Sequence, residues 1–282
     1  MKVFVIGVGL IGGSLVTDIK VAYNDAVIYG IDANEANLQR AIELGFVDKS
    51  ATFAELKLAD VVIVSVPVDV VRLVLPQVLD AVSEKCLVFD VGSTKEKLCA
   101  QVETHSNRAC YLAAHPIAGT EFSGPNAALA NLFRGKANII CEIDKTGQAQ
   151  KELALDIFER LGMRLRYMDA AAHDKHIAYV SHLSHVSSFM LGKTVIEKEK
   201  NERDIFDMAG SGFASTVRLA KSSPAMWTPI FKQNKENVIG ALQEYIDNLT
   251  AFKELMETEN DDDIFNEMKN TNRIKTILEG IG

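Results

Sequence analysis

His115 is the residue whose type and position best suit proton transfer. It follows the apolar run Ala109–Ala114, precedes Pro116 and leads into the glycine-containing segment 117–124. An imidazole titrates near neutral pH, so a histidine at the end of a strand can remove a proton from a substrate hydroxyl. The alternative is a loop histidine whose hydrogen bonds are only structural.

A second group of polar residues lies between positions 173 and 185, which contain four histidines and two serines. Ser181 and His185 are four residues apart, so on a helix they share one face and could line a polar substrate pocket, whereas His182 points elsewhere. The alternative is a zinc site. It has no cysteine nearby, and we expect no metal. The histidines that such a site would use are His173, His176, His182 and His185.

Arg218 is a candidate for binding a substrate carboxylate. It lies in the otherwise apolar stretch Thr216–Ala220, and a guanidinium can hold a carboxylate through two parallel hydrogen bonds. The alternative is an ordinary surface arginine. Trp227, the single tryptophan, is expected to pack in the core or at a dimer contact.

Three glycines near the N-terminus have the spacing of a dinucleotide-binding turn. Gly7, Gly9 and Gly12 follow the β-branched apolar run Val3–Ile6 and open a segment with helical periodicity. Gly7 permits the tight turn, Gly9 lets a pyrophosphate approach the backbone, and Gly12 lets the helix pack on the strand. The alternative is a glycine-rich turn that binds nothing.

The residues around this turn complete a predicted NAD site. The helix that starts at Leu10 and Ile11 presents free N–H groups to the phosphates. Asp32 follows the second strand, where a carboxylate can bind the ribose hydroxyls and repel a 2′-phosphate, so we expect NAD rather than NADP. Ser65 and Pro67 follow the third strand and are also expected to contact the cofactor.

Alternating strands and helices predict an α/β fold with a doubly wound, Rossmann-type parallel sheet. We expect residues 1–169 to form this domain and residues 170–282 to form an all-helical substrate and dimerisation domain. Ser93 or Thr94 is expected to cap a helix beginning near Lys95. The predicted strands are Val3–Ile6, Ala26–Ile31, a run from Ala59 to Pro67, Cys86–Asp90, Ala109–Ala114, Ala137–Cys141 and Met163–Met168.

Bulk composition excludes several classes of protein. The 282 residues are 48% hydrophobic and carry a formal net charge of −8, which argues against non-specific nucleic-acid binding. No apolar run approaches the length of a membrane span. The chain opens directly on a strand and its four cysteines form no C-x-x-C pair. We therefore expect a cytoplasmic protein without a signal peptide.

Taken together, these segments resemble the monofunctional prephenate/arogenate dehydrogenases of tyrosine biosynthesis. The histidine-proline loop and the later Ser-His-Leu-Ser-His run are far more specific than the nucleotide motif. Residues 213–218 depart from the pattern, because an arginine and an aspartate common in relatives are missing. The matching stretches are Gly7–Ser14, Asp90–Lys95, His115–Gly124, His173-Asp174, Ser181–His185 and Arg218–Trp227.

The resemblance implies an NAD-dependent oxidative decarboxylation in a homodimer. Ring C4 of prephenate would give hydride to NAD⁺ while the C1 carboxylate leaves as CO₂, yielding 4-hydroxyphenylpyruvate. By position, His115 matches the histidine that accepts the C4 hydroxyl proton, and Ser93 matches a serine that orients that histidine or the hydroxyl. His185 with Ser181, Arg218 and Glu121 match residues that contact or discriminate the substrate.

Two alternatives stay open on the sequence alone. An arogenate dehydrogenase would give tyrosine directly, and no single residue distinguishes its amino side chain from the keto side chain of prephenate. A protein that only senses NAD(H) would bind the nucleotide without turnover, but would not require Ser93, His115, His185 and Arg218 all in place.

Overall fold

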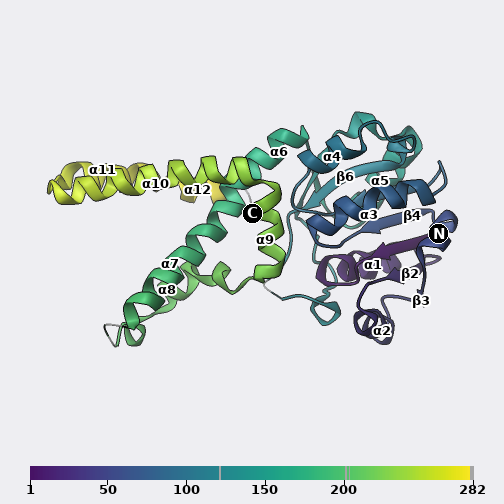
Figure 1. Cartoon of the computed structure of the whole chain (residues 1–282), viewed down its shortest axis with the longest axis horizontal. Coiled ribbons are helices and arrows are strands. Elements are labelled where there is room, and N and C mark those ends of the chain that lie inside the picture. Colours follow the sequence, from purple (N-terminus) through teal and green to yellow (C-terminus); the bar gives the residue numbers. More distant parts are fainter. Residues whose placement is uncertain (121, 201, 203, 280–282) are drawn as a thin grey trace. The chain divides into compact units, whose positions relative to one another are not determined.

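A computed structural model of the chain describes residues 1–120, 122–200, 202 and 204–279. It contains an eight-stranded sheet, some of whose strands are labelled in Figure 1, with the strand order β3-β2-β1-β4-β5-β6-β7-β8. The strands are β1 (Lys2–Ile6), β2 (Val27–Ile31), β3 (Lys49–Ser50), β4 (Val61–Val64), β5 (Leu87–Asp90), β6 (Tyr111–Pro116), β7 (Ala137–Cys141) and β8 (Arg164–Met168).

The helices fall into those that connect the strands and those that follow the last strand. The connecting helices are α1 (Leu10–Ala22), α2 (Glu35–Glu43), α3 (Val68–Ala81), α4 (Glu96–Val102) and α5 (Gln148–Arg160). The later helices are α6 (Ala170–Ile177), α7 (Leu183–Glu199), α8 (Ser211–Thr216), α9 (Pro224–Gln233), α10 (Lys235–Glu257), α11 (Asp261–Thr271) and α12 (Ile274–Glu279).

The sheet is buried on both faces because its central strands are apolar at nearly every position. Val3 and Val5 of β1 belong to one apolar cluster with side chains of α1 and α5, whereas Phe4 and Ile6 belong to a second cluster with α3 and α4. Successive side chains of a strand point to opposite faces, so a strand covered on both sides must be apolar throughout. The predicted doubly wound sheet is confirmed.

The last two strands of the sheet, β7 and β8, run opposite to the first six. β7 is antiparallel to β6, whereas every other neighbouring pair in the sheet is parallel. A parallel pair needs a crossover connection, usually a helix, to return the chain to the starting edge. The described residues between β6 and β7 form turns and a short 3₁₀ segment instead. The sheet is therefore mostly, and not wholly, parallel.

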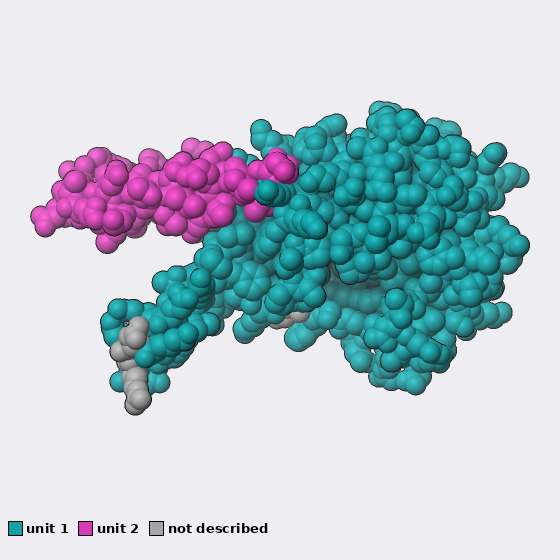
Figure 2. Space-filling view, viewed as in Figure 1, with its two compact units in different colours: residues 1–235 teal, residues 236–282 magenta. Residues whose placement is uncertain are grey.

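The chain divides into two compact units, coloured separately in Figure 2. The first comprises Met1–Lys235 and so includes the sheet with α6 to α9, and the second comprises Glu236–Gly282. The expected domain boundary between residues 169 and 170 falls inside the first unit and stays a proposal. Among the described residues, no helix is long and apolar enough to cross a membrane.

The tight packing of α1 on β1 generates a stability prediction. A Cβ at Gly12 would lie 2.1 Å from the carbonyl oxygen of Gly7, which is backbone and cannot rotate away. Gly12→Ala should therefore lower the free energy of unfolding by about 1–3 kcal/mol, as overpacking does, measured by urea denaturation. Gly212→Ala, where a Cβ meets nothing within 4 Å, is the control and should leave the free energy of unfolding unchanged or raise it slightly, because Ala favours the helix. Equal effects would contradict the packing argument.

Candidate active site

The glycine turn has the geometry of a phosphate-binding loop. Gly7 has a φ of 93°, and a Cβ there would lie 2.3 Å from the carbonyl oxygen of Ser65. At Gly9, by contrast, a Cβ would approach only Gly124 N, at 3.9 Å. A side chain at Gly7 or Gly12 would thus clash with the backbone, whereas the space next to Gly9 is free. This is the pattern predicted for a pyrophosphate that approaches the backbone at Gly9.

The N-terminus of α1 is suited to bind an anion. Gly9 is the N-cap and supplies no side-chain acceptor, and the first turn contains no acidic residue. The N–H groups of Leu10, Ile11 and Gly12 have no acceptor within the helix, because the first turn of any α-helix lacks them. These donors and the helix dipole fit the negative charge of a dinucleotide.

Asp32 lies beside the glycine turn. One of its oxygens accepts a hydrogen bond from Val8 N at 3.0 Å, and the other accepts one from Asn34 N at 2.8 Å. The carboxylate is partly exposed and follows β2, as predicted. Ser65 follows β4 next to Gly7, and Pro67 is the exposed N-cap of α3.

A buried ion pair that the sequence did not reveal fixes the turn after β5. Lys95 and Asp90 are both completely buried, and the Lys95 ammonium bonds to Asp90 Oδ2. Tyr111 donates to Asp90 Oδ1 at 2.6 Å, and Gly92 N donates to Oδ2 at 2.8 Å. Asp90 therefore has three hydrogen-bonding partners. Two of them, Gly92 and Lys95, belong to the turn that carries Ser93, so these bonds fix the conformation of that turn.

His115 bonds to a histidine from the helical segment. Its Nδ1 lies 2.8 Å from Nε2 of His173 on α6, and His173 Nδ1 lies 2.7 Å from Asp174 Oδ1. Burial, followed by electrostatic interactions with the neighbouring His173 and Lys95, holds the pKa of His115 well below its usual range. At neutral pH His115 is thus an uncharged imidazole at the carboxyl end of β6, able to accept a proton.

Asp174 also caps α4. Its two oxygens accept hydrogen bonds from Lys95 N at 2.7 Å and from Glu96 N at 3.0 Å. The prediction that Ser93 or Thr94 caps this helix is wrong: the acceptor comes from α6, 78 residues away in sequence from Glu96. A carboxylate accepts both N–H groups at once, whereas a hydroxyl accepts with a single oxygen.

Ser93 is not bonded to His115 in the structure. It lies partly exposed in the turn between β5 and α4. Among the described residues, the only hydrogen bond of the His115 ring is the one to His173. Sequence reasoning thus missed the partner of His115, although His173-Asp174 stood out as a matching pair. Glu121, the other residue predicted near this loop, lies outside the described residues.

Ser181 and His185 lie where a π-helical turn, Ala178–His182, joins α6 to α7. The His185 ring donates from Nδ1 to the carbonyl oxygen of Ser181 at 2.9 Å, so the two residues are neighbours through the backbone of Ser181 rather than its hydroxyl. The His185 ring also stacks on Trp227, with ring centroids 3.5 Å apart. Single π turns of this kind are frequent at functional sites.

Arg218 lies near His185. It is exposed at the start of the 3₁₀ turn Arg218–Lys221. The pKa of His185 is lowered by burial and by the positive charge of Arg218, while its bond to Ser181 opposes the shift. A solvent-accessible guanidinium beside a neutral imidazole can bind a carboxylate.

Two histidines of the alternative zinc site bond to different partners. His173 bonds to His115, whereas Nδ1 of His182 lies 3.1 Å from Nδ2 of Asn234. Burial lowers the pKa of His182 to about 4. Within the part of the chain that the structure describes, no cluster of three or more His, Cys, Asp or Glu side chains could hold a metal ion.

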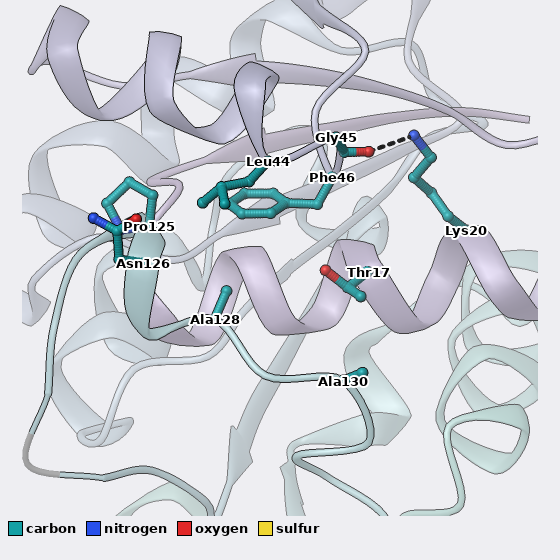
Figure 3. Close-up of a pocket in the computed structure, with 9 residues that line it drawn as sticks. All are labelled: Thr17, Lys20, Leu44, Gly45, Phe46, Pro125, Asn126, Ala128 and Ala130. Atoms are coloured by element: carbon teal, nitrogen blue, oxygen red, sulfur yellow. Dashed lines mark hydrogen bonds between the residues drawn. The ribbon is translucent and has the colours of Figure 1, made fainter.

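A surface pocket beside α1 contains none of the predicted site residues (Figure 3). Its one lysine, Lys20, bonds to the carbonyl oxygen of Gly45. Its lining residues are Thr17, Lys20, Leu44, Gly45, Phe46, Pro125, Asn126, Ala128 and Ala130.

A doubly wound sheet with a dinucleotide-type turn and a neutral histidine at the same edge defines a class, the nucleotide-binding oxidoreductases. The family model for the prephenate dehydrogenase nucleotide-binding domain matches residues 16–167, and the one for its dimerization domain matches residues 169–270. The chain belongs to the prephenate dehydrogenase family.

Known relatives match over nearly the whole chain. The crystal structure of prephenate dehydrogenase from A. aeolicus, in complex with hydroxyphenyl propionate and NAD⁺, is 33% identical with a TM-score of 0.91, covering 99% of this chain and 98% of that one. Prephenate dehydrogenase of Bacillus subtilis is 28% identical, covering 93% of this chain and 72% of its own length. Cyclohexadienyl dehydrogenase of Zymomonas mobilis is 27% identical, covering 98% and 95%.

The buried ion pair can be tested by stability. Lys95→Met leaves Asp90 buried without its cation, so we expect a loss of about 3–5 kcal/mol in the free energy of unfolding, measured by urea denaturation. Lys85→Met, at an exposed lysine just before β5, is the matched control and should stay within about 0.5 kcal/mol of wild type. A loss at Lys95 as small as that of the control would show that Asp90 does not depend on this partner.

Proposed function

We propose that the protein catalyses the NAD-dependent oxidative decarboxylation of prephenate to 4-hydroxyphenylpyruvate. NAD⁺, when bound, supplies the acceptor for the hydride from ring C4. The bond from C1 to its carboxylate breaks, CO₂ leaves, and the electron pair enters the ring, which becomes aromatic. The observation that carries the proposal is the neutral His115 near the carboxyl end of β6. The accessible Gly9 of the phosphate-binding turn lies at the carboxyl end of β1, on the same side of the sheet.

His115 acts first as a base and then as an acid. Removing the C4 hydroxyl proton helps the hydride to leave, because the oxygen's electrons can then form a carbonyl. Loss of CO₂ converts that carbonyl to a phenolate, which takes the proton back. The overall reaction releases no net proton, so His115 needs to keep the proton only between its removal from the hydroxyl and its return to the phenolate. The lowered pKa of His115 favours this return.

The substrate side chain and its carboxylate are held from the helical segment. Arg218 binds a substrate carboxylate, and His185 with Ser181 faces the side chain of the substrate. The support is their proximity: the charge of Arg218 acts on His185, which bonds to Ser181. Ser93 binds the C4 hydroxyl from the turn after β5, and Glu121 discriminates between substrates.

The cofactor site favours NAD over NADP. Asp32 is fixed by Val8 N and Asn34 N beside the open side of the glycine turn. A carboxylate in that position accepts hydrogen bonds from ribose hydroxyls and repels a 2′-phosphate. Gly7, Gly9 and Gly12 form the phosphate loop, with Leu10, Ile11, Ser65 and Pro67 around it.

The functional enzyme is a homodimer in the cytoplasm, with residues 170–282 supplying the dimer contact. The second compact unit, Glu236–Gly282, carries many large apolar side chains that are more than 40% exposed, and such a surface calls for a partner. The four cysteines are buried free thiols, which suits a reducing compartment. The apolar residues are Ile239, Ile246, Leu249, Met256, Phe265, Met268, Ile274, Ile277 and Leu278.

The proposal is tested by following NADH absorbance with prephenate and with arogenate, each with NAD⁺ and with NADP⁺. Faster turnover of prephenate with NAD⁺ supports it. Preference for arogenate keeps the mechanism and changes the substrate, because the two molecules differ only in a keto or amino side chain. Binding of NADH without turnover of either substrate would contradict catalysis and favour a sensor.

The role of His115 predicts a large loss of turnover on substitution. His115→Asn should lower kcat by about 10²–10⁴-fold, the usual contribution of a general base, while the Kd for NAD⁺ stays unchanged. His176→Asn places the same substitution on the exposed side of α6 and should leave kcat within about twofold of wild type, because general-base catalysis needs a group that reaches the reacting proton. Steady-state kinetics and a fluorescence titration of the cofactor provide the two readouts. Unchanged turnover in His115→Asn would remove this residue from the mechanism.

The role of Arg218 predicts a different kinetic signature. Arg218→Gln should raise KM for prephenate by about 10–100-fold with a smaller change in kcat, because a charge-assisted hydrogen bond contributes about 1.5–3 kcal/mol. Arg166→Gln, at an exposed position of β8, is the control and should not change KM. If KM is the same in both variants, another cation holds the carboxylate.

A further inference from the structure

Three side chains form a continuous hydrogen-bonded row that ends at the proposed base. His115 Nδ1 lies 2.8 Å from His173 Nε2, and His173 Nδ1 lies 2.7 Å from Asp174 Oδ1. The rings of the two histidines meet edge to face, with centroids 5.1 Å apart. His173 and Asp174 are only 2% exposed, so water does not compete for these bonds.

The order of donors and acceptors along the row follows from its far end. A carboxylate only accepts, so Nδ1 of His173 carries the hydrogen and donates to Asp174. When His173 is the neutral imidazole, its other nitrogen is an acceptor, so His173 Nε2 accepts from His115 Nδ1. His115 must therefore carry its hydrogen on Nδ1, which leaves the lone pair of Nε2 free. That nitrogen is the one that can take a proton from substrate.

Asp174 is itself fixed, which makes this order stable. Its oxygens accept from Lys95 N at 2.7 Å and Glu96 N at 3.0 Å, and its backbone oxygen accepts from Asn234 Nδ2 at 2.6 Å. Because its oxygens already serve two backbone donors, the carboxylate cannot turn away from His173 without leaving buried N–H groups unpaired. Lys95 and His182 are the other ionisable groups that act electrostatically on His115.

We propose that His173 and Asp174 are positioning residues that hold His115 in the Nδ1–H tautomer, so that its Nε2 faces the substrate as the base. The catalytic part of this inference rests on the proposed function, but the tautomer itself does not. Neither residue touches the reacting atoms; both act through the orientation and protonation of His115.

A pair of substitutions at His173 distinguishes its role as a hydrogen-bond acceptor from its role in filling space. In His173→Gln the side-chain oxygen can replace Nε2 as the acceptor for His115, whereas His173→Leu fills the space without an acceptor. We expect His173→Leu to lower kcat about 10²-fold with KM and the Kd for NAD⁺ changed less than about threefold, and His173→Gln to recover at least about tenfold of that loss. A purely structural role would not produce this rescue.

The tautomer can be observed directly by nitrogen NMR of protein labelled with ¹⁵N-histidine, with the His115 signals assigned by their absence in His115→Asn. Long-range nitrogen–proton correlations should show His115 as Nδ1–H in the wild type and in His173→Gln. In His173→Leu the Nε2–H form should gain population. This readout needs neither cofactor nor substrate.

If His173→Leu does not fold, Asp174→Ala tests the same positioning role, and Asp169→Ala is its control. Each change removes a carboxylate that accepts two N–H groups at the start of a helix, but only Asp174 also bonds to His173. Only Asp174→Ala should shift the His115 tautomer and lower kcat.

An Nδ1–H tautomer that persists in both His173→Leu and Asp174→Ala, or equal kcat in His173→Gln and His173→Leu, would overturn the inference. Should the wild type turn over neither prephenate nor arogenate, the proposed function fails while the NMR result still decides the tautomer. A wild type that is active but shows His115 as Nε2–H would leave the proposed function standing and refute the positioning role.

Discussion

The carboxylate of Asp174 is the constraint on which the site depends. The first N–H groups of α4 need an acceptor, and no nearby side chain in the described part of the sequence supplies one. Asp174 supplies it from α6 and so ties the segment after the sheet to the edge where the strands end. The same carboxylate bonds to His173, which reaches His115. A requirement of helix capping and a requirement of proton transfer are thus met by one group.

The sheet explains why the remaining parts meet there. Parallel strands place their carboxyl ends at a common edge, and ligands of open α/β sheets bind beyond it. The glycine turn follows β1, the Lys95 turn follows β5, and His115 lies at the end of β6. The ion pair of Lys95 and Asp90 keeps the middle turn rigid, and the charge of Lys95 disfavours protonated His115. An NAD-dependent enzyme of the prephenate dehydrogenase family needs a neutral base beside its cofactor, and this arrangement provides one.

Much of this could be predicted from the sequence because the signals are local. The run Val3–Ile6 and the glycine spacing define a strand, a turn and a helix within a few residues, and the position of His115 after an apolar run puts it at the sheet edge. What could not be predicted depends on distant parts of the chain. The cap of α4 comes from Asp174, and the burial of Lys95 depends on Asp90 and Tyr111. The reversal of β7 follows from an irregular connection that has no periodic signal.

In the proposed reaction each turnover transfers the hydride of ring C4 to NAD⁺ and releases the C1 carboxylate as CO₂. The most direct test uses prephenate that carries deuterium at C4, incubated with the enzyme and NAD⁺, with the reduced cofactor analysed by mass spectrometry and the CO₂ measured in the same sample. The account predicts that the deuterium appears in the reduced nicotinamide and that CO₂ and NADH form in equal amounts. Reduced cofactor without deuterium, or NADH formed without CO₂, would contradict it.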